Sequence, residues 1–244
     1  MNNVLVKADY SGQELRVLAE VSKDANMVAA FNKNYDLHLY TANRVFNLGL
    51  DDKDFINGTP EHEEASGKFK EKRHQAKNGI NFPTVYGAFP KRIAKDNKVS
   101  IEEAQRWLDE FDKLYPGVKK AVQLTKKELK EQGYVTTLMG RRRRFPYYNS
   151  ADRYEKGHME RAAFNFKIQG LSADMMKIAA GKILHILPEY QAKYVLTVHD
   201  ELVWELPYKH AKQFSCKVKH IMEGCICLSV PLIVDVSIVK SYGD

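Results

Sequence analysis

The sequence contains neither a long apolar run nor enough cysteine for a disulfide framework. No stretch approaches the roughly 18 consecutive apolar residues that a membrane-spanning helix needs. The three cysteines, Cys216, Cys225 and Cys227, cannot all pair within the chain, so we expect reduced thiols in the core. A metal site at Cys225 and Cys227 would need further ligands, which the neighbouring residues do not supply. The start, Met1-Asn2-Asn3-Val4, is not typical of a signal peptide, and we expect a cytoplasmic protein with no membrane partner.

Acidic residues are fewer than basic ones, and no repeat or low-complexity segment interrupts the chain. The 38 Lys and Arg outnumber the 31 Asp and Glu, which gives a formal net charge of +7. A basic chain favours an anionic partner such as nucleic acid. The hydrophobic content of 44% in 244 residues can supply the core of one large domain or of two smaller ones.

Two distant apolar segments end on carboxylates. Residues 4–8 lead to Asp9, and residues 195–198 lead to His199, Asp200 and Glu201, after which the chain is apolar again. The β-branched flanks predict two antiparallel strands joined by a very tight turn at His199 and Asp200. Carboxylates at strand ends are held rigidly and suit hard divalent cations, and a two-metal phosphoryl-transfer site needs two of them. Taken alone, the turn would more often be merely solvated, because Asp is common in turns.

A basic and aromatic helix is predicted over residues 71–86. Arg73 and Lys77 fall one turn apart, as do Phe82 and Tyr86. Two cations and an aromatic ring on one face would suit a nucleoside triphosphate. The alternative is a solvated basic face whose aromatic residues belong to the core.

The spacing within this helix contains one extra residue. Lys77 to Phe82 is a step of five, which on a regular helix turns the aromatic side chains by about 100°. Because Pro83 lacks an N–H and would crowd the carbonyl of Gly79, we predict a kink or π-bulge that returns Phe82 and Tyr86 to the face of Lys77. A regular helix would instead bring Asn78 or Asn81 into nucleotide contacts.

The C-terminal half offers two further basic or polar features. Two amphipathic helices are predicted in residues 100–132, followed by a hairpin over 133–146 that carries four arginines, 141–144, for phosphate contacts or simply as a solvated turn. A long helix over about 152–187 has an apolar stripe, while Arg161, Asn165 and Gln169 recur every four residues. Such a row can test base-pair geometry in the minor groove, although an exposed helix face would look the same. A helix over 208–223 and a strand over 230–239 complete the chain.

Six motifs, in this order, resemble those of the C-terminal polymerase region of the family A (DNA polymerase I-like) DNA polymerases, and the match covers nearly all of the chain. They lie at residues 9–16, 36–38, 73–87, 133–142, 160–170 and 198–201. The resemblance implies an α+β fold, with a partial palm of antiparallel sheet and helices plus mostly helical fingers, and without thumb or exonuclease. It places the palm at 1–17 and 133–244, with the catalytic hairpin at 194–206, and the fingers at 18–132. One departure is Gly12-Gln13, where the family usually has Gln followed by Ile, so contact from Gln13 stays open.

The resemblance implies template-directed DNA synthesis, in which dNTPs are transferred to a primer 3′-hydroxyl with two Mg²⁺ ions, Mn²⁺ being an alternative. The implied catalytic residues are Asp9, Asp200 and Glu201, and the metal ligands are Asp9, Asp200 and the backbone carbonyl of Tyr10. The implied nucleotide-binding residues are Glu14, which would exclude a ribose 2′-hydroxyl, His38, Arg73, Lys77, Phe82 and Tyr86. The implied contacts to primer-template DNA come from Arg161, Asn165, Gln169, His199, Arg141 and Arg142.

The matching motifs include none from the family's thumb or from the first part of its palm. A partial palm sheet would expose an edge, so we expect a second chain that carries the thumb and the remaining palm, or self-association. A split polymerase of phage type, at work in a bacterial or phage-infected cell, would fit this pattern, and so would an expressed fragment. The alternative function is a non-catalytic nucleic-acid-binding or assembly module that retains the fold. A two-metal nuclease would leave the triphosphate helix unexplained.

Overall fold

The computed structural model describes residues 3–243; Met1, Asn2 and Asp244 lie outside the described residues. By its internal contacts the chain forms two compact units, Met1–Val17 with Gln169–Asp244, here called the sheet unit, and Leu18–Ile168, here called the helical unit. Helices α1 (Gln13–Ser22) and α10 (Arg153–Leu184) each contribute residues to both units. None of the helices described is long and apolar enough to cross a membrane.

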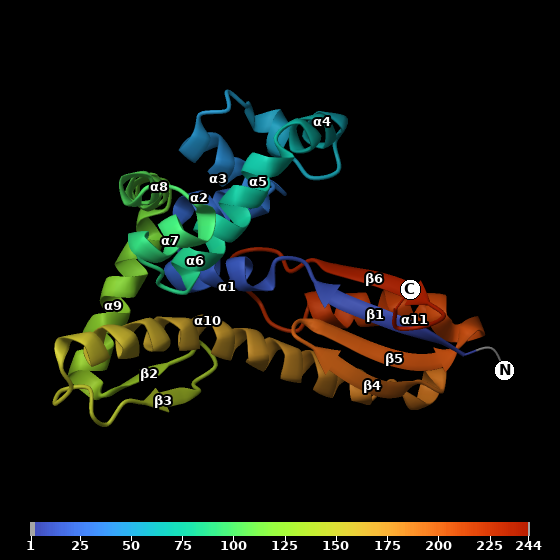
Figure 1. Cartoon of the computed structure of the whole chain (residues 1–244). Coiled ribbons are helices and arrows are strands. Elements are labelled where there is room, and N and C mark those ends of the chain that lie inside the picture. The colour runs from blue at the N-terminus through green and yellow to red at the C-terminus, as the bar shows by residue number, and fades with distance from the viewer. Residues whose placement is uncertain (1–2, 244) are drawn as a thin grey trace. The chain divides into compact units, whose positions relative to one another are not determined.

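The sheet unit is built on four antiparallel strands in the order β4-β5-β1-β6 (Figure 1). Strand β1 (Asn3–Tyr10) lies between β5 (Glu201–Pro207) and β6 (Val234–Val239), and β4 (Lys193–Val198) lies outside β5. The predicted tight turn is confirmed, because Val198 pairs directly with Glu201 and His199 adopts the left-handed conformation at φ 53°. Strand β6 begins at Val234, later than the 230 predicted.

The core of the sheet unit lies between the sheet and helix α11 (Tyr208–Glu223), which contacts β1, β5 and β6. Trp204 of β5 and Phe214 of α11 meet edge to face, with ring centroids 5.6 Å apart. The consecutive residues Leu202, Val203 and Trp204 are all buried. Because successive side chains of a strand point to opposite faces, both faces of β5 are therefore covered. A short 3₁₀ turn, η3 (Pro188–Tyr190), connects α10 to β4.

The expectation that all three thiols lie in the core is wrong for two of them. Cys225 is buried, whereas Cys216 and Cys227 are exposed. Helix α11 buries only one face, through Ala211, Phe214, Val218 and Met222. Cys216 falls outside this helical spacing, and Cys227 lies in the loop that follows the helix.

Polar side chains cap the starts of four helices of the helical unit. Asp24, Asp36, Thr59 and Ser100 accept backbone N–H groups at the first turns of α2, α3, α4 and α8. Fully buried Trp107 and Phe111 of α8 belong to its core. Besides the helical turns of residues 70–85, the described part of this unit contains α2 (Ala25–Asn32), α3 (Leu37–Phe46), η1 (Asp52–Phe55), α4 (Pro60–Lys68), α7 (Pro90–Asn97), α8 (Ile101–Leu114) and α9 (Pro116–Gln132).

The predicted helix over 71–86 is not regular. It consists of α5 (Lys70–Ala76), a π-helical turn η2 (Lys77–Asn81) and α6 (Phe82–Val85). The π turn confirms the distortion predicted from the five-residue step, because a π turn accommodates one more residue than an α-helical turn. Gly79 suits the turn, since a Cβ at this position would collide with the side chain of Asn97 in α7.

The predicted hairpin is formed by β2 (Tyr134–Thr136) and β3 (Arg142–Arg144). Its turn includes Gly140 at φ 83°, a conformation that glycine adopts without strain. The hairpin packs on α9 and on the first half of α10 through a small apolar cluster of Leu129, Val135, Phe145, Tyr148 and Ala163. This cluster fixes the hairpin within the helical unit.

Candidate functional site

The carboxylates predicted from the two distant strand ends are brought together by the sheet. Asp9 of β1 pairs with Glu201 of β5 on one side and with Asp235 of β6 on the other. The backbone N–H of Tyr10 donates to the carbonyl of Asp200 at 3.3 Å, which places the turn of the β4–β5 hairpin beside the end of β1. Asp9, Asp200 and Glu201 therefore gather at one end of the sheet, and the Asp9 side chain is exposed there.

The electrostatics of this cluster are those of carboxylates crowded together. Burial, followed by the charges of Asp200 and Glu201, raises the pKa of the Asp9 carboxyl from its ordinary value of 3.8 to about 6; Asp235 adds to the effect. A cation would favour the ionised form of these groups. Among residues 3–243, no group of three or more His, Cys, Asp or Glu side chains is arranged to hold a metal ion by itself.

Hydrogen bonds of Tyr10 and Arg16 anchor the end of β1. The Tyr10 hydroxyl donates to the carbonyl of Met222 at 2.8 Å and lies 3.2 Å from the Cys225 sulfur, and burial raises the pKa of this hydroxyl. The Arg16 guanidinium donates to the carbonyl oxygens of Ser11 at 2.8 Å and Pro231 at 2.6 Å, so it ties the loop after β1 to the loop before β6. Asp9 is thus carried by a strand end with little freedom to move.

The two residues that follow the loop after β1 differ in burial. Gln13 is buried, and its amide donates to the carbonyl of Ser172 in α10 at 3.5 Å. Gln13 therefore joins α1 to α10 inside the sheet unit. Glu14, in the first turn of α1, is half-buried.

Three of the predicted nucleotide-binding residues, His38, Lys77 and Phe82, lie together in the helical unit. The rings of His38 in α3 and Phe82 in α6 pack with centroids 5.7 Å apart, and the Lys77 ammonium lies 5.9 Å from the centroid of Phe82. The π turn thus brings Phe82 back to Lys77, as predicted from the spacing. Tyr86, half-buried just after α6, stays a prediction.

Arg73 is held by a residue to which sequence reasoning gave no role. The Oδ2 atom of Asp36 accepts from Arg73 Nε at 2.5 Å and lies 3.2 Å from His62 Nε2, while Oδ1 accepts the N–H groups of His38 and Leu39. Burial would raise the pKa of Asp36, but the hydrogen bond and charge of Arg73 outweigh it and the pKa lies below its usual value. The available sequence signal was an Asp in the N-cap position before His38.

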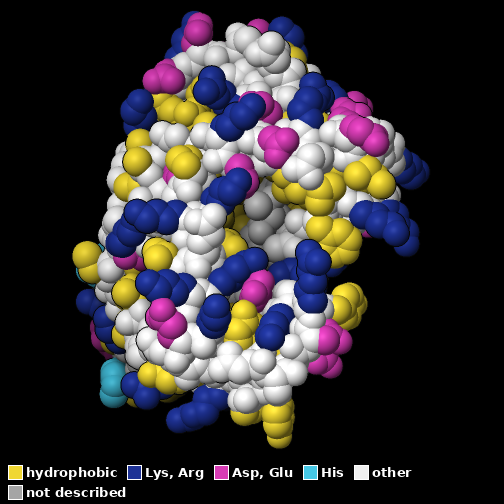
Figure 2. Space-filling view, turned by 90° about the vertical axis from the view of Figure 1, so that its left-hand side faces the viewer, with side chains coloured by type: hydrophobic (Ala, Val, Ile, Leu, Met, Phe, Trp, Pro, Cys, Tyr) yellow, Lys and Arg dark blue, Asp and Glu magenta, His cyan; other side chains and the backbone are white. Residues whose placement is uncertain are grey.

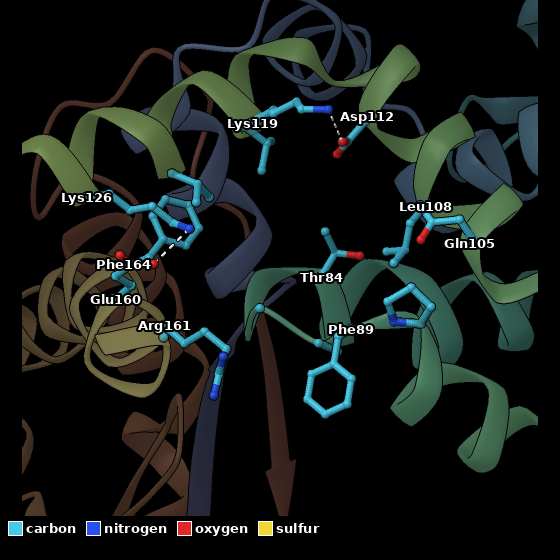
Figure 3. A pocket seen from close by; sticks show the side chains of 16 residues that line it. Thr84, Phe89, Gln105, Leu108, Asp112, Lys119, Lys126, Glu160, Arg161 and Phe164 are labelled. Carbon is cyan, nitrogen blue, oxygen red and sulfur yellow. Dashed lines mark ion pairs between the residues drawn. The ribbon is translucent and has the colours of Figure 1, made fainter. Parts of the chain in front are cut away.

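A cavity of about 470 Å³ lies within the helical unit, between the end of α6, α7, α8, α9 and the first half of α10 (Figure 3). Arg161 of α10 and Phe89, which is 51% exposed, both line it and lie in the lower part of the view. Gly87 also lines it at φ 66°, and a Cβ at Gly87 would lie 2.7 Å from Cγ of Arg161. The predicted DNA contact Arg161 is therefore packed directly against a glycine. The ion pairs Lys119–Asp112 and Lys126–Glu160 also lie in the lining of this cavity.

The other predicted DNA contacts are spread over both units. Asn165 is half-buried and Gln169 and His199 are exposed. Arg141 and Arg142 are exposed on the hairpin, and the Arg142 guanidinium lies 5.0 Å from the ring centroid of Tyr134. Lys and Arg side chains are distributed over the whole of the face shown in Figure 2, as the net charge of +7 suggests.

Comparison with known proteins gives a consistent result. The family model described as DNA polymerase family A matches residues 1–244. The chain is 39% identical over 236 residues to DNA polymerase I of Caldicellulosiruptor bescii, covering 96% of this chain and 26% of that protein. It is 36% identical over 239 residues to the thermostable DNA polymerase I of Thermus aquaticus, covering 98% of this chain and 27% of that protein.

A solved structure extends this similarity to the fold. The POL domain of Pol1 from M. smegmatis, in complex with DNA primer-template and dNTP, matches with a TM-score of 0.85 and 30% identity, over 98% of this chain and 40% of that one. The chain therefore spans about a quarter of the length of the curated relatives it matches. On these findings, the chain belongs to the family A DNA polymerases, of which it is a partial palm and fingers.

Proposed function

We propose that the chain performs template-directed DNA synthesis, transferring nucleotides from dNTPs to a primer 3′-hydroxyl, as the catalytic palm and fingers part of a split or truncated polymerase. The observation that carries this proposal is the meeting of Asp9 with Glu201 and Asp200 at one end of the sheet. Crowding of these carboxylates raises the pKa of Asp9, which is unfavourable for the fold by itself and is relieved by a bound cation. A non-catalytic module would not need them.

The residues of the cluster fit divalent metal ions. Asp9 and Asp200, with the backbone carbonyl of Tyr10, would hold them, and Mg²⁺ often binds proteins through only one or two carboxylates, with water and substrate phosphates completing its shell. Two Mg²⁺ ions, or Mn²⁺ in their place, would when bound activate the 3′-hydroxyl and neutralise phosphate charge. Glu201 would support the carboxylates, and His199 would lie near the primer terminus.

The helical unit offers the chemistry of triphosphate binding. Lys77 and Arg73 supply charge for phosphate oxygens, where charge-assisted hydrogen bonds are strong. Asp36 orients the Arg73 side chain through Nε, so its terminal nitrogens are held in a defined plane. Phe82 would pack on the sugar, Tyr86 would lie at the templating position, and Glu14 would exclude a 2′-hydroxyl.

The DNA would be held by polar side chains that read shape rather than sequence. Arg161, Asn165 and Gln169 of α10 would contact the primer-template duplex, and Arg141 and Arg142 its phosphates. Cation–π packing of Arg142 on Tyr134 would hold one of these contacts in place. We place this activity in the cytoplasm of a bacterium or of a phage-infected cell.

A second chain would complete the palm. Within the described residues, β4 and β6 are the edge strands of the sheet, and β4 exposes Tyr194, Val195 and Val198. Exposed edges invite strand pairing. We therefore propose that a chain carrying the thumb and the remaining palm, or a second copy of this chain, joins the sheet unit.

Primer extension tests the proposal. The purified chain, alone and with the product of the neighbouring gene, is given a primer-template, Mg²⁺ and four dNTPs. We expect extension in the presence of the partner and its loss in Asp200→Ala, while Asp235→Asn, which alters a neighbouring carboxylate with no assigned role, keeps extending. Extension that survives Asp200→Ala would refute the metal assignment. No extension with the partner present would favour a binding module.

A further inference from the structure

The π turn η2 brings a buried amide to the ring of His38. Asn81, the last residue of η2, is completely buried, and its Nδ2 lies 2.9 Å from Nδ1 of His38, a residue 43 positions earlier in the chain. With the amide in this orientation, Asn81 Nδ2 donates and His38 Nδ1 accepts, so Nδ1 carries no proton. A neutral imidazole with an unprotonated Nδ1 carries its proton on Nε2.

The surroundings keep this ring neutral. Burial lowers the pKa of His38 to about 4, against the pull of Asp36 at the start of α3, and the charges of Arg73 on α5 and Lys77 on η2 lower it further. Phe82 of α6 covers the ring with a centroid distance of 5.7 Å. With Nδ1 occupied by Asn81, the remaining hydrogen-bonding group of His38 is the Nε2–H donor.

The extra residue of this chain makes the contact. On an α-helix continued from α5, Asn81 would be rotated by about 100° from its position after the π turn. The turn also requires Gly79, because a Cβ there would meet Asn97. Within the described residues, Oδ1 of Asn81 is buried with no hydrogen-bond partner.

We propose that Asn81 is a positioning residue that fixes His38 in the Nε2–H tautomer, so that the ring donates to an anionic phosphate oxygen of the incoming nucleotide. This inference rests on the proposed function of the helical unit. The proposal explains why the neutral His38 ring lies near the two cations Arg73 and Lys77. Arg73 and Lys77 supply attraction, whereas His38 supplies direction without adding charge.

Nitrogen-15 NMR of the full chain tests the proposal without relying on activity. The His38 resonances, one set among eight histidines, are assigned with His38→Gln. In the wild type we expect a proton on Nε2 at pH 7, and a change of the Nε2 resonance on addition of dTTP and Mg²⁺. A proton on Nδ1 would overturn the tautomer assignment. An Nε2 resonance that dTTP leaves unchanged would overturn the ligand assignment.

The substitution Asn81→Asp replaces the amide, whose nitrogen donates a hydrogen bond, with a carboxylate of nearly the same shape that only accepts. The carboxylate would accept from Nδ1–H, so the tautomer should switch and the His38 titration midpoint should rise by about one to three pH units. The Kd of dTTP should rise about tenfold as the directed hydrogen bond is lost. Asn81→Ser, which adds no charge, serves if the aspartate variant does not fold, and should leave His38 in a mixture of tautomers.

Asn78→Asp is the matched control. It introduces the same charge in the same turn, at an exposed amide that lies 2.9 Å from Nε2 of His74. It should leave the His38 tautomer unchanged. An unchanged tautomer in Asn81→Asp would overturn the proposal. Primer extension that fails while dTTP still moves the wild-type Nε2 resonance would count against the proposed function alone.

Discussion

Gly87 and Gly133 form a natural pair for measuring how tightly Arg161 is packed. Both have a left-handed backbone, with φ of 66° and 70°. A Cβ at Gly87 would lie 2.7 Å from Cγ and 2.9 Å from Cδ of Arg161, whereas a Cβ at Gly133 would meet nothing within 4 Å. Alanine at either position bears the same conformational strain, and only at Gly87 does it also collide.

The two losses of stability can be worked out separately. Left-handed backbone costs a non-glycine residue about 1–2 kcal/mol, so Gly133→Ala should lower the free energy of unfolding by about 1 kcal/mol. Overpacking adds about 1–3 kcal/mol, which brings Gly87→Ala to about 2–4 kcal/mol. For a chain of 244 residues, each kcal/mol corresponds to roughly 2–4 °C in Tm.

Thermal and urea unfolding followed by circular dichroism measure both variants. The collision is isolated by a double-mutant cycle with Arg161→Ala, which removes Cγ and Cδ. In the Arg161→Ala background, Gly87→Ala should cost no more than Gly133→Ala does. Equal losses for the two glycines in the wild-type background, or a cycle that is additive within about 0.5 kcal/mol, would refute the packing of Arg161 on Gly87.

Three further predictions concern titration and thiol exposure. The pKa of His38 is lowered to about 4 in the folded chain, so the unfolded chain binds this proton first as the pH falls below about 6.5. The free energy of unfolding should therefore fall between pH 6.5 and pH 4 by up to about 3 kcal/mol. In His38→Gln, urea unfolding should show a weaker dependence of this free energy on pH. Because the pKa of Asp9 is raised to about 6, ionisation of this carboxyl destabilises the fold as the pH rises through 6. Asp9→Asn should therefore raise the free energy of unfolding at pH 8 by about 1 kcal/mol, after allowance for solvent screening at this exposed group, and leave it unchanged at pH 4. Ellman's reagent should titrate Cys216 and Cys227 in the folded chain and reach Cys225 only in denaturant; rapid reaction of all three thiols would contradict the burial of Cys225.

Local chemistry was enough to predict most elements of the fold. The β-branched flanks of His199 and Asp200 predict the hairpin because strand propensity and turn chemistry act over a few residues. The π turn was predictable for a related reason. A five-residue step, with a glycine and a proline inside it, conflicts with a regular helix, and a local conflict must be resolved locally.

Contacts between distant residues were not predictable in the same way. Asp36 to Arg73, Asn81 to His38 and Gly87 to Arg161 each join separate elements. Periodicity indicates which face of a helix is buried but not which residue lies opposite it. The cysteines show the same limit, because Cys216 lies on a helix whose buried face is defined by other residues.

The carboxylates at the end of the sheet form the intermediate case. Sequence reasoning predicted that Asp9 and Asp200 end two strands, and a tight hairpin predicted Glu201 beside them. The pairing of Asp9 with both Glu201 and Asp235 depends on β1 lying between β5 and β6. That order is a property of the whole sheet, which no single strand determines.

Single-nucleotide incorporation by Asp9→Asn and by Asp235→Asn, compared with the wild type, tests the central claim most directly. A primer-template with saturating dNTP and Mg²⁺ is used, together with the partner chain, and the first-order rate of one addition is measured. If Asp9 holds the metal ions of nucleotidyl transfer, Asp9→Asn should slow the addition on the order of 10³-fold while Asp235→Asn stays within a few fold. Equal rates for Asp9→Asn and the wild type would contradict the claim that this carboxylate cluster is the catalytic centre.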